Sequence, residues 1–149
     1  MRILKAFEEF LEEGTAKRVS VDKQRAQHLR QEAERKYTVL TKTIDAMGID
    51  DTLANDYVED CYNILMFLLR AHMLEQGYSS SGPGAHESEV AFARRLGWQE
   101  TDVRILDELR YFRNGILYYG KQLDKEYAEK ALAFTKKGVS ALGNGLRTA

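Results

Sequence analysis

The sequence predicts an all-α protein, an up-and-down antiparallel bundle of five to six helices. Three observations indicate this class. The 149 residues include a single proline, Pro83, and long proline-free stretches favour helices because proline removes a backbone donor. Apolar residues recur every three or four positions over most of the chain, and glycines stand where these patterns end. Short connections between long amphipathic helices favour antiparallel neighbours.

The first two predicted helices each end at a glycine. Apolar residues repeat at helical spacing over residues 3–11 and stop at Gly14, which predicts a short helix. The next helix is long, with Ser20 as its expected cap and Gly48 at its end. Steps of three and four residues define its buried stripe: Ala26, Leu29, Ala33, Tyr37, Leu40, Ile44 and Met47.

A third helix is expected to be the centre of the bundle. It begins at Asp51 or Thr52 and runs to Gly77, and its middle, residues 64–69, is apolar on every side. Glycine, serine and proline over residues 77–84 predict the one real loop of the chain. No strand is needed to account for the sequence.

Three further patterns complete the bundle. A helix is predicted over residues 85–96, and Thr101 or Asp102 caps the following one, which Gly120 closes. The buried stripe of that helix is expected at Ile105, Leu109, Phe112, Ile116 and Tyr119. The last helix begins near Leu123 and is expected to bury Tyr127, Ala131, Phe134 and Leu142.

Composition predicts one ordinary globular domain spanning residues 1–149, with 44% apolar and 30% charged residues. The net charge of −1 excludes a generally basic nucleic-acid coat but allows a local patch. The lone Cys61 lies in an apolar run, which favours a buried thiol and a reducing, cytoplasmic setting. No apolar run reaches the roughly 20 residues of a membrane span, so no membrane association is expected. Cys61, His28, His72 and His86 show no zinc-ligand spacing, so no metal and no cofactor is expected.

Two weaker features have both a structural and a functional interpretation. A basic stretch is either the solvated face of a helix or a surface for an anionic partner: Lys17, Arg18, Lys23, Arg25, Arg30, Arg35 and Lys36. His86 follows Pro83 and Gly84 at a helix start, where free backbone N–H groups favour an anion. The alternative for His86 is a side-chain cap or a loop hydrogen bond.

The most informative segment is residues 109–120. It places Arg113 and Asn114 inside a strongly apolar helix and follows them with Tyr118 and Tyr119. A guanidinium is not deprotonated in a protein, so an arginine drawn toward a core needs a carboxylate, a phosphate or a cleft facing water. Asn114 and Tyr118 are one helical turn apart and share a face. These side chains are the candidate functional site.

A purely structural interpretation of this segment pairs Arg113 with Asp107, Glu108 or Asp60 in a buried ion pair. In that case the protein would be a helical scaffold with no cleft beside Arg113. The nearby tyrosines are either core aromatics with satisfied hydroxyls or platforms on which bases stack: Tyr111, Tyr118 and Tyr119.

Residues 54–125 resemble the HEPN superfamily, small helical domains found beside minimal nucleotidyltransferases and in defence ribonucleases. The central helix carries the apolar run of residues 62–71, and a Gly/Ser loop leads into the His86 helix start. The Arg113 segment is similar to the family's signature of an arginine followed by a histidine after four to six residues, often with asparagine next to the arginine. The family's histidine would fall at residues 118–120, which here are Tyr-Tyr-Gly.

The resemblance implies a dimeric module that binds nucleotide, RNA or a minimal nucleotidyltransferase partner, without efficient catalysis. Arg113 and Asn114 would line the cleft with Tyr118 at its wall, and Tyr119 and His86 are further candidate ligand-binding residues. Catalytic family members are metal-independent ribonucleases whose arginine and histidine meet at a dimer cleft. The alternative is therefore an endoribonuclease of the toxin or defence type, using Arg113 with Tyr118 or His86.

Overall fold

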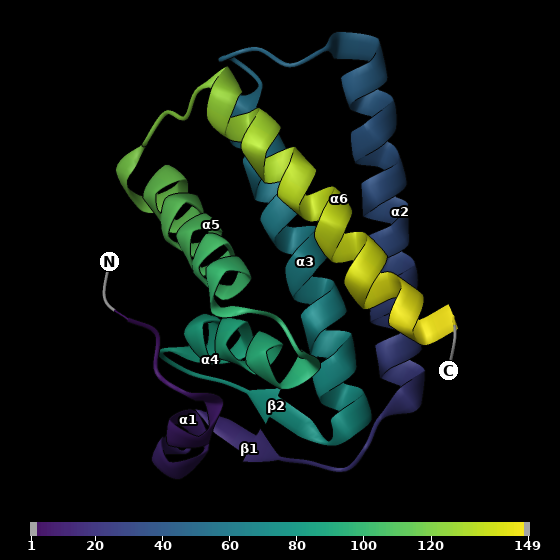
Figure 1. The fold of residues 1–149 in the computed structure, drawn as a ribbon, viewed down its shortest axis with the longest axis vertical. Helices are drawn as coiled ribbons and strands as arrows, with labels where there is room; N and C mark the ends of the chain where they lie inside the picture. The colour runs from purple at the N-terminus through teal and green to yellow at the C-terminus, as the bar shows by residue number, and fades with distance from the viewer. Residues whose placement is uncertain (1–2, 148–149) are drawn as a thin grey trace.

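The structure, a computed structural model, describes residues 3–147 and is an all-α bundle (Figure 1). The predicted fold class is confirmed. In the described part of the chain the helices are α1 (Phe7–Glu13), α2 (Lys23–Met47), α3 (Ala54–Gln76), α4 (Ala85–Phe92), α5 (Glu100–Tyr119) and α6 (Lys125–Arg147). A short 3-10 helix, η1 (Ala93–Leu96), extends α4 up to the predicted stop at Gly97.

The helix α3 is central, as its apolar middle predicts, and it packs against α2, α5 and α6 (Figure 1). The four long helices alternate in direction along the chain. Arg30 near the start of α2 meets Glu75 near the end of α3, so these two are antiparallel. His72 and Leu142 join the ends of α3 and α6, so these two run parallel. No described helix has both the length and the apolar content required to cross a bilayer.

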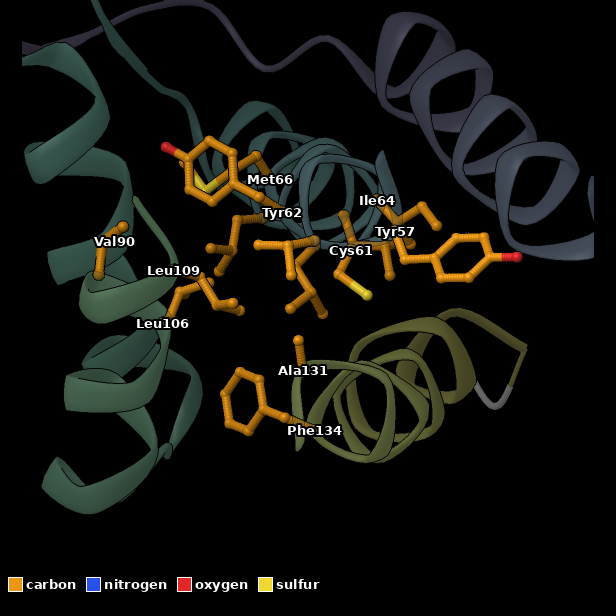
Figure 2. Packing of buried hydrophobic residues seen from close by; sticks show 14 of the residues in the cluster. Tyr57, Cys61, Tyr62, Ile64, Met66, Val90, Leu106, Leu109, Ala131 and Phe134 are labelled. Atoms are coloured by element: carbon orange, nitrogen blue, oxygen red, sulfur yellow. The ribbon is translucent and has the colours of Figure 1, made fainter. Parts of the chain in front are cut away.

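Side chains from α3 dominate the main core, and α2, α4, α5 and α6 cover it (Figure 2). The largest fully buried side chains of α3 are Tyr57, Tyr62, Ile64, Leu65, Met66, Leu68, Leu69 and Met73. The figure shows Tyr57 and Tyr62 pointing to opposite sides of this cluster, each with its hydroxyl at the periphery. The bundle is therefore organised around a helix whose apolar residues face every neighbour.

Two short strands correct the expectation that the chain contains no strand. The strand β1 (Ala16–Arg18) pairs antiparallel with β2 (Tyr78–Ser80), and Ala16 lies opposite Ser80. The pairing joins the segment after α1 to the loop after α3, so part of the predicted loop is a strand. Three residues are too few to show an alternating pattern, and the partner strand is distant in the sequence.

Gly77 shows why the loop after α3 begins with glycine. Its φ of +80° is in the left-handed region, and an added Cβ would lie 2.9 Å from the carbonyl oxygen of Val19. The Val19 N–H donates to the Gly77 carbonyl at 2.8 Å, which brings the two backbones together. Only glycine meets both conditions without a shift of the backbone.

The helix ends agree with the sequence better than the helix starts. Gly14, Gly48, Gly77 and Gly120 all follow the helices they were expected to end. The predicted cap at Ser20 is wrong, because α2 is capped by Asp22, whose carboxylate accepts the Arg25 N–H. The predicted caps at Thr101 and Asp102 are also wrong, because α5 begins one residue before Thr101 and has no side-chain cap.

Candidate functional site

The expected stripe of α5 is confirmed except at its last residue, because Leu109 is buried and Ile105, Phe112 and Ile116 pack partly buried against the main core. Val103, Leu106, Asp107 and Leu109 are buried, whereas Tyr119 is 87% exposed, so its assignment to the core is wrong. Tertiary packing decides this, because α5 presents apolar residues on more than one side. Continuing the buried series by one turn leads to Arg113. The side chain of Arg113 is consequently half-buried on the side of α5 that faces α3.

The guanidinium of Arg113 lies over the ring of Tyr62, with Cζ 5.6 Å from the ring centroid. Its Nε is buried and has no hydrogen-bond partner among the residues that the structure describes. Within the described residues no carboxylate forms an ion pair with it. Asp107 instead accepts from Arg110 Nε at 2.7 Å, and Glu108 accepts from a tyrosine hydroxyl of α6. The ion pair of the structural interpretation is therefore absent from the described part of the chain.

Tyr62 lies under several charged groups. The residue is 2% exposed, and its hydroxyl is buried without a hydrogen-bond partner in the described part of the chain. Burial and the nearby Glu89 carboxylate raise the pKa of this hydroxyl, while Arg70, Arg110 and Arg113 act in the opposite direction. Tyr62 is therefore a neutral phenol whose pKa is influenced by one carboxylate and three guanidinium groups.

A second group of polar side chains, from α3 and α4, lies near Tyr62. Arg70 of α3 binds Glu89 of α4 through Nε at 2.6 Å and Nη2 at 3.2 Å. The His86 ring packs edge-on against Tyr62 at 6.5 Å between centroids. Both Arg113 and His86 therefore contact Tyr62, so the structure brings these two predicted residues into one neighbourhood.

The Nδ1 atom of His86 has two competing partners. It lies 3.1 Å from Glu89 Oε1 and 3.3 Å from Arg70 Nη2. With a proton, Nδ1 donates to the carboxylate, and without one it accepts from the guanidinium. The side chain of His86 is half-exposed, so a ligand can reach this ring. The ring of His86 therefore joins an ion-pair network and is not a helix cap.

The remaining predicted site residues of α5 lie outward. Asn114 is half-buried and lies between Arg113 and the solvent-facing side of the helix. Tyr118 is 72% exposed and Tyr119 is 87% exposed, so neither is a core aromatic. Neither tyrosine contacts His86 in the described chain. Arg113 and His86 thus both contact Tyr62, whereas Tyr118 and Tyr119 lie on the surface.

Sequence reasoning missed the supporting residues of this site, namely Tyr62, Arg70, Glu89 and Arg110. One signal was present: Arg70 is the sole Lys, Arg, Asp or Glu between Asp60 and Glu75 on the most apolar helix. Such an isolated charge in a buried helix requires a partner. The partner lies on another helix, so its identity depends on the tertiary structure.

The basic stretch at residues 17–36 divides into two kinds of side chain. Most of its cations are exposed, including Arg25 and Arg35. Arg30 is buried and forms a bidentate ion pair with Glu75, with N to O distances of 2.5 and 2.6 Å. Arg30 is therefore structural and does not belong to a solvated surface or an anion-binding patch.

Metal and thiol chemistry receive no support from the geometry. Among the described residues, His, Cys, Asp and Glu form no group of three that could hold a metal ion. Cys61 is buried, as expected, and burial raises the pKa of its thiol to about 12. A protonated, inaccessible thiol is a poor nucleophile.

Comparisons of the chain with family models, with curated proteins and with solved structures gave no match. The chemistry of the site is accordingly argued from its own residues. A half-buried guanidinium without a carboxylate partner in the described chain, on a tyrosine ring that a half-exposed histidine also contacts, is suited to binding a phosphate group.

Proposed function

We propose that this chain is a helical module that binds the phosphate groups of RNA or of a nucleotide through Arg113 and Asn114, without efficient catalysis. One observation supports it above the others. Arg113 is half-buried, stacks on Tyr62 and has no carboxylate partner in the described chain. A partly desolvated guanidinium in this state gains strongly from an anion that accepts charge-assisted hydrogen bonds.

The surroundings of Arg113 favour nucleic acid over a simple anion. Tyr118 and Tyr119 are exposed on the same end of α5, where their rings are available for stacking against bases. Asn114 adds amide donors and an acceptor next to the guanidinium. The resemblance of residues 54–125 to the HEPN superfamily supports the same ligand class and a minimal nucleotidyltransferase as a protein partner.

The proposal includes a homodimer built on the C-terminal half of α5. This surface exposes four large apolar or aromatic side chains: Tyr111, Leu117, Tyr118 and Tyr119. Clustered exposed aromatics are typical of protein interfaces and are unusual on a monomer surface. Symmetry would then bring the two copies of Asn114 and Arg113 close to a shared cleft.

The direct test measures the affinity of a fluorescently labelled single-stranded RNA for the wild type and for Arg113→Ala. We expect a loss of about tenfold or more, the value of a charge-assisted hydrogen bond to phosphate. The dependence of log K on log salt should also become shallower by about 0.7, because one phosphate contact is lost.

Arg104→Ala is the matched control, since Arg104 is exposed on the same helix and makes no contact with Tyr62. Circular dichroism establishes that both variants are folded. Equal affinity and equal salt dependence for Arg113→Ala and the wild type would refute the proposal.

The second candidate is a metal-independent endoribonuclease in which Arg113 acts with His86. The observation that favours it is the contact of both residues with Tyr62, which brings a fixed cation and a titratable base together. Tyr118 is a poor general base at neutral pH, because the ordinary pKa of tyrosine is about 10. RNA cleavage in EDTA that is lost in both Arg113→Ala and His86→Ala would establish this activity, and its absence from the wild type would exclude it.

A further inference from the structure

A hollow of about 430 Å³ opens between α2, α3, β2 and α4. This volume is within the range of roughly 300–1,000 Å³ that is usual for small-molecule sites. Arg70, His86 and Glu89 form the wall between this hollow and Tyr62. Arg113 and Asn114, the proposed phosphate ligands, do not line the hollow, although it shares Arg70, His86 and Glu89 with the site described above.

The floor of the hollow is apolar. Leu29 from α2 and Phe67, Met73 and Leu74 from α3 line it. The Phe67 ring is only half-buried, with Lys36 Nζ at 5.7 Å and Arg70 Cζ at 6.0 Å from its centroid. An apolar surface of this kind, edged by cations, suits a flat and electron-rich ring.

The rim of the hollow carries polar and positively charged groups. Arg25 is exposed, lines the hollow and forms no ion pair within the described residues. The hydroxyls of Ser79 and Ser80 lie on the β2 side, and Ser80 Oγ is 2.9 Å from Ser88 Oγ. The charge of Arg70 is balanced by Glu89, so Arg25 leaves the rim with an excess positive charge. Such a rim favours an anionic group.

We propose that this hollow binds a nucleoside monophosphate, with the base on the apolar floor and the phosphate at Arg25 and the serine hydroxyls. The buried Glu89 carboxylate would accept a hydrogen bond from a base amino group, since its bonds to Arg70 and His86 leave one acceptor position. The ligand is either a free mononucleotide or the phosphorylated end of an RNA chain, which share this chemistry. The inference does not depend on RNA binding at Arg113.

The test is titration calorimetry of the purified chain with the 5′-monophosphates of adenosine, guanosine, cytidine and uridine. Adenosine and inorganic phosphate are measured separately, because each has only half of the proposed ligand. We expect at least one monophosphate to bind more tightly than either half. Failure of all four to bind at millimolar concentration overturns the inference.

Two variants, each with a matched control, test whether the nucleotide binds in the hollow. Leu29→Trp fills the hollow without changing a charge and should weaken binding by at least about tenfold, because overpacking removes the space for the base. Val39→Trp is its matched control, since Val39 is exposed on the same helix and outside the hollow. Arg25→Gln should also weaken binding, and Arg35→Gln on the same helix should not. Melting curves confirm that each variant is folded.

The outcomes separate this inference from the proposed function. Monophosphate binding that is lost in Leu29→Trp and retained in Arg113→Ala supports the hollow as the site. Binding that is lost in Arg113→Ala and retained in Leu29→Trp overturns the hollow and leaves the proposed function intact. A 5′-phosphorylated oligoribonucleotide that loses affinity in Leu29→Trp, unlike its 5′-hydroxyl form, identifies an RNA end as the source. If Leu29→Trp weakens the binding of the free nucleotide and not that of the oligoribonucleotide, the ligand is a free mononucleotide.

Discussion

Tyr57 and Tyr62 are two tyrosines on α3 that are both 2% exposed, and their hydroxyls have different surroundings. The Tyr57 hydroxyl donates to the Gly48 carbonyl at 2.8 Å. The Tyr62 hydroxyl has no partner, although it lies close to charged groups of α3, α4 and α5. A buried hydroxyl without a partner costs free energy, so its retention beside Arg113 and His86 is consistent with a role in the site.

Replacing these tyrosines by phenylalanine should therefore change stability in opposite directions. Tyr57→Phe should lower the free energy of unfolding by about 1 kcal/mol, because a hydrogen bond is lost and a carbonyl is left unpaired. Tyr62→Phe should be neutral or stabilising by up to about 1 kcal/mol, because an unsatisfied polar atom is removed. Urea unfolding measures both. A clear loss of stability in Tyr62→Phe would show that its hydroxyl has a partner after all.

His72 couples the stability of the bundle to pH. Its Nε2 donates to the Leu142 carbonyl at 2.9 Å, and its Nδ1 is 3.9 Å from Glu75 Oε1. Burial lowers the pKa of His72 below its ordinary value of 6.5, and the charge of Arg30 lowers it further. The unfolded chain therefore takes up this proton at a higher pH than the folded chain.

We expect the His72 contribution to be complete above about pH 6.5 and to be lost as the pH falls below it toward the lowered pKa of the folded state. His72→Gln keeps a donor for Leu142 but does not titrate, so its free energy of unfolding should fall less between pH 7 and pH 5. His28→Gln, at an exposed position of α2, should keep the wild-type pH dependence. Identical pH profiles for His72→Gln and the wild type would contradict this coupling.

At the scale of elements, the contact of α6 with α3 depends on a small residue at Gly138. A Cβ added there would lie 2.5 Å from Leu65 Cδ2 and 3.5 Å from the Trp98 ring. Leu65 is fully buried, so its side chain has no free space into which to move. Gly143, five residues further along α6, has no atom of the described residues within 4 Å of the same position.

The substitutions Gly138→Ala and Gly143→Ala should therefore act oppositely although both lie in one helix. Alanine is favoured over glycine in a helix by about 1 kcal/mol, and Gly143→Ala should gain most of this. Gly138→Ala gains the same propensity but adds overpacking of about 1–3 kcal/mol, so the net effect should be destabilising. Thermal unfolding of the pair provides the comparison. Stabilisation by both would indicate that α6 moves away from α3 at little cost.

The short sheet joins two segments whose contact the apolar periodicity of the helices does not predict. It places β2 between the N-terminal segment and α4, next to a second apolar cluster that includes Phe7, Phe10 and Phe92. This cluster also includes Ala91, next to Phe92 at the end of α4, the helix from which His86 and Glu89 reach Arg70. The position of half of the candidate site thus depends on contacts with the N-terminal segment.

At the scale of the whole molecule, the exposed aromatic end of α5 predicts self-association. Light scattering after size-exclusion chromatography should give the mass of a dimer at micromolar concentration. Leu117→Glu should shift the protein to the monomer, because a charge at an apolar interface is desolvated without a partner. Val39→Glu is the matched control: Val39 is 51% and Leu117 is 48% exposed. A wild type that remains monomeric at high concentration would remove the dimer from the proposal.

The sequence by itself determined the local features of this protein. The all-α class, the central helix and the glycine at each helix end follow from apolar periodicity and backbone conformation, which act over a few neighbouring residues. It also identified Arg113, because a permanent charge inside an apolar helix requires an unusual environment. Asp22 at the start of α2 was missed because several residues near a helix start have similar capping ability.

Only the tertiary structure decided how these elements meet. It paired Arg70 with Glu89 and Arg110 with Asp107, and it left Arg113 over Tyr62 without a carboxylate. It also formed the two short strands and the hollow between four elements. Each of these features depends on the rotation of one element against another. Arg113 lies on the side of α5 that faces α3 and Tyr119 on the solvent side, and local sequence preferences differ too little between the possible rotations of this helix to select one.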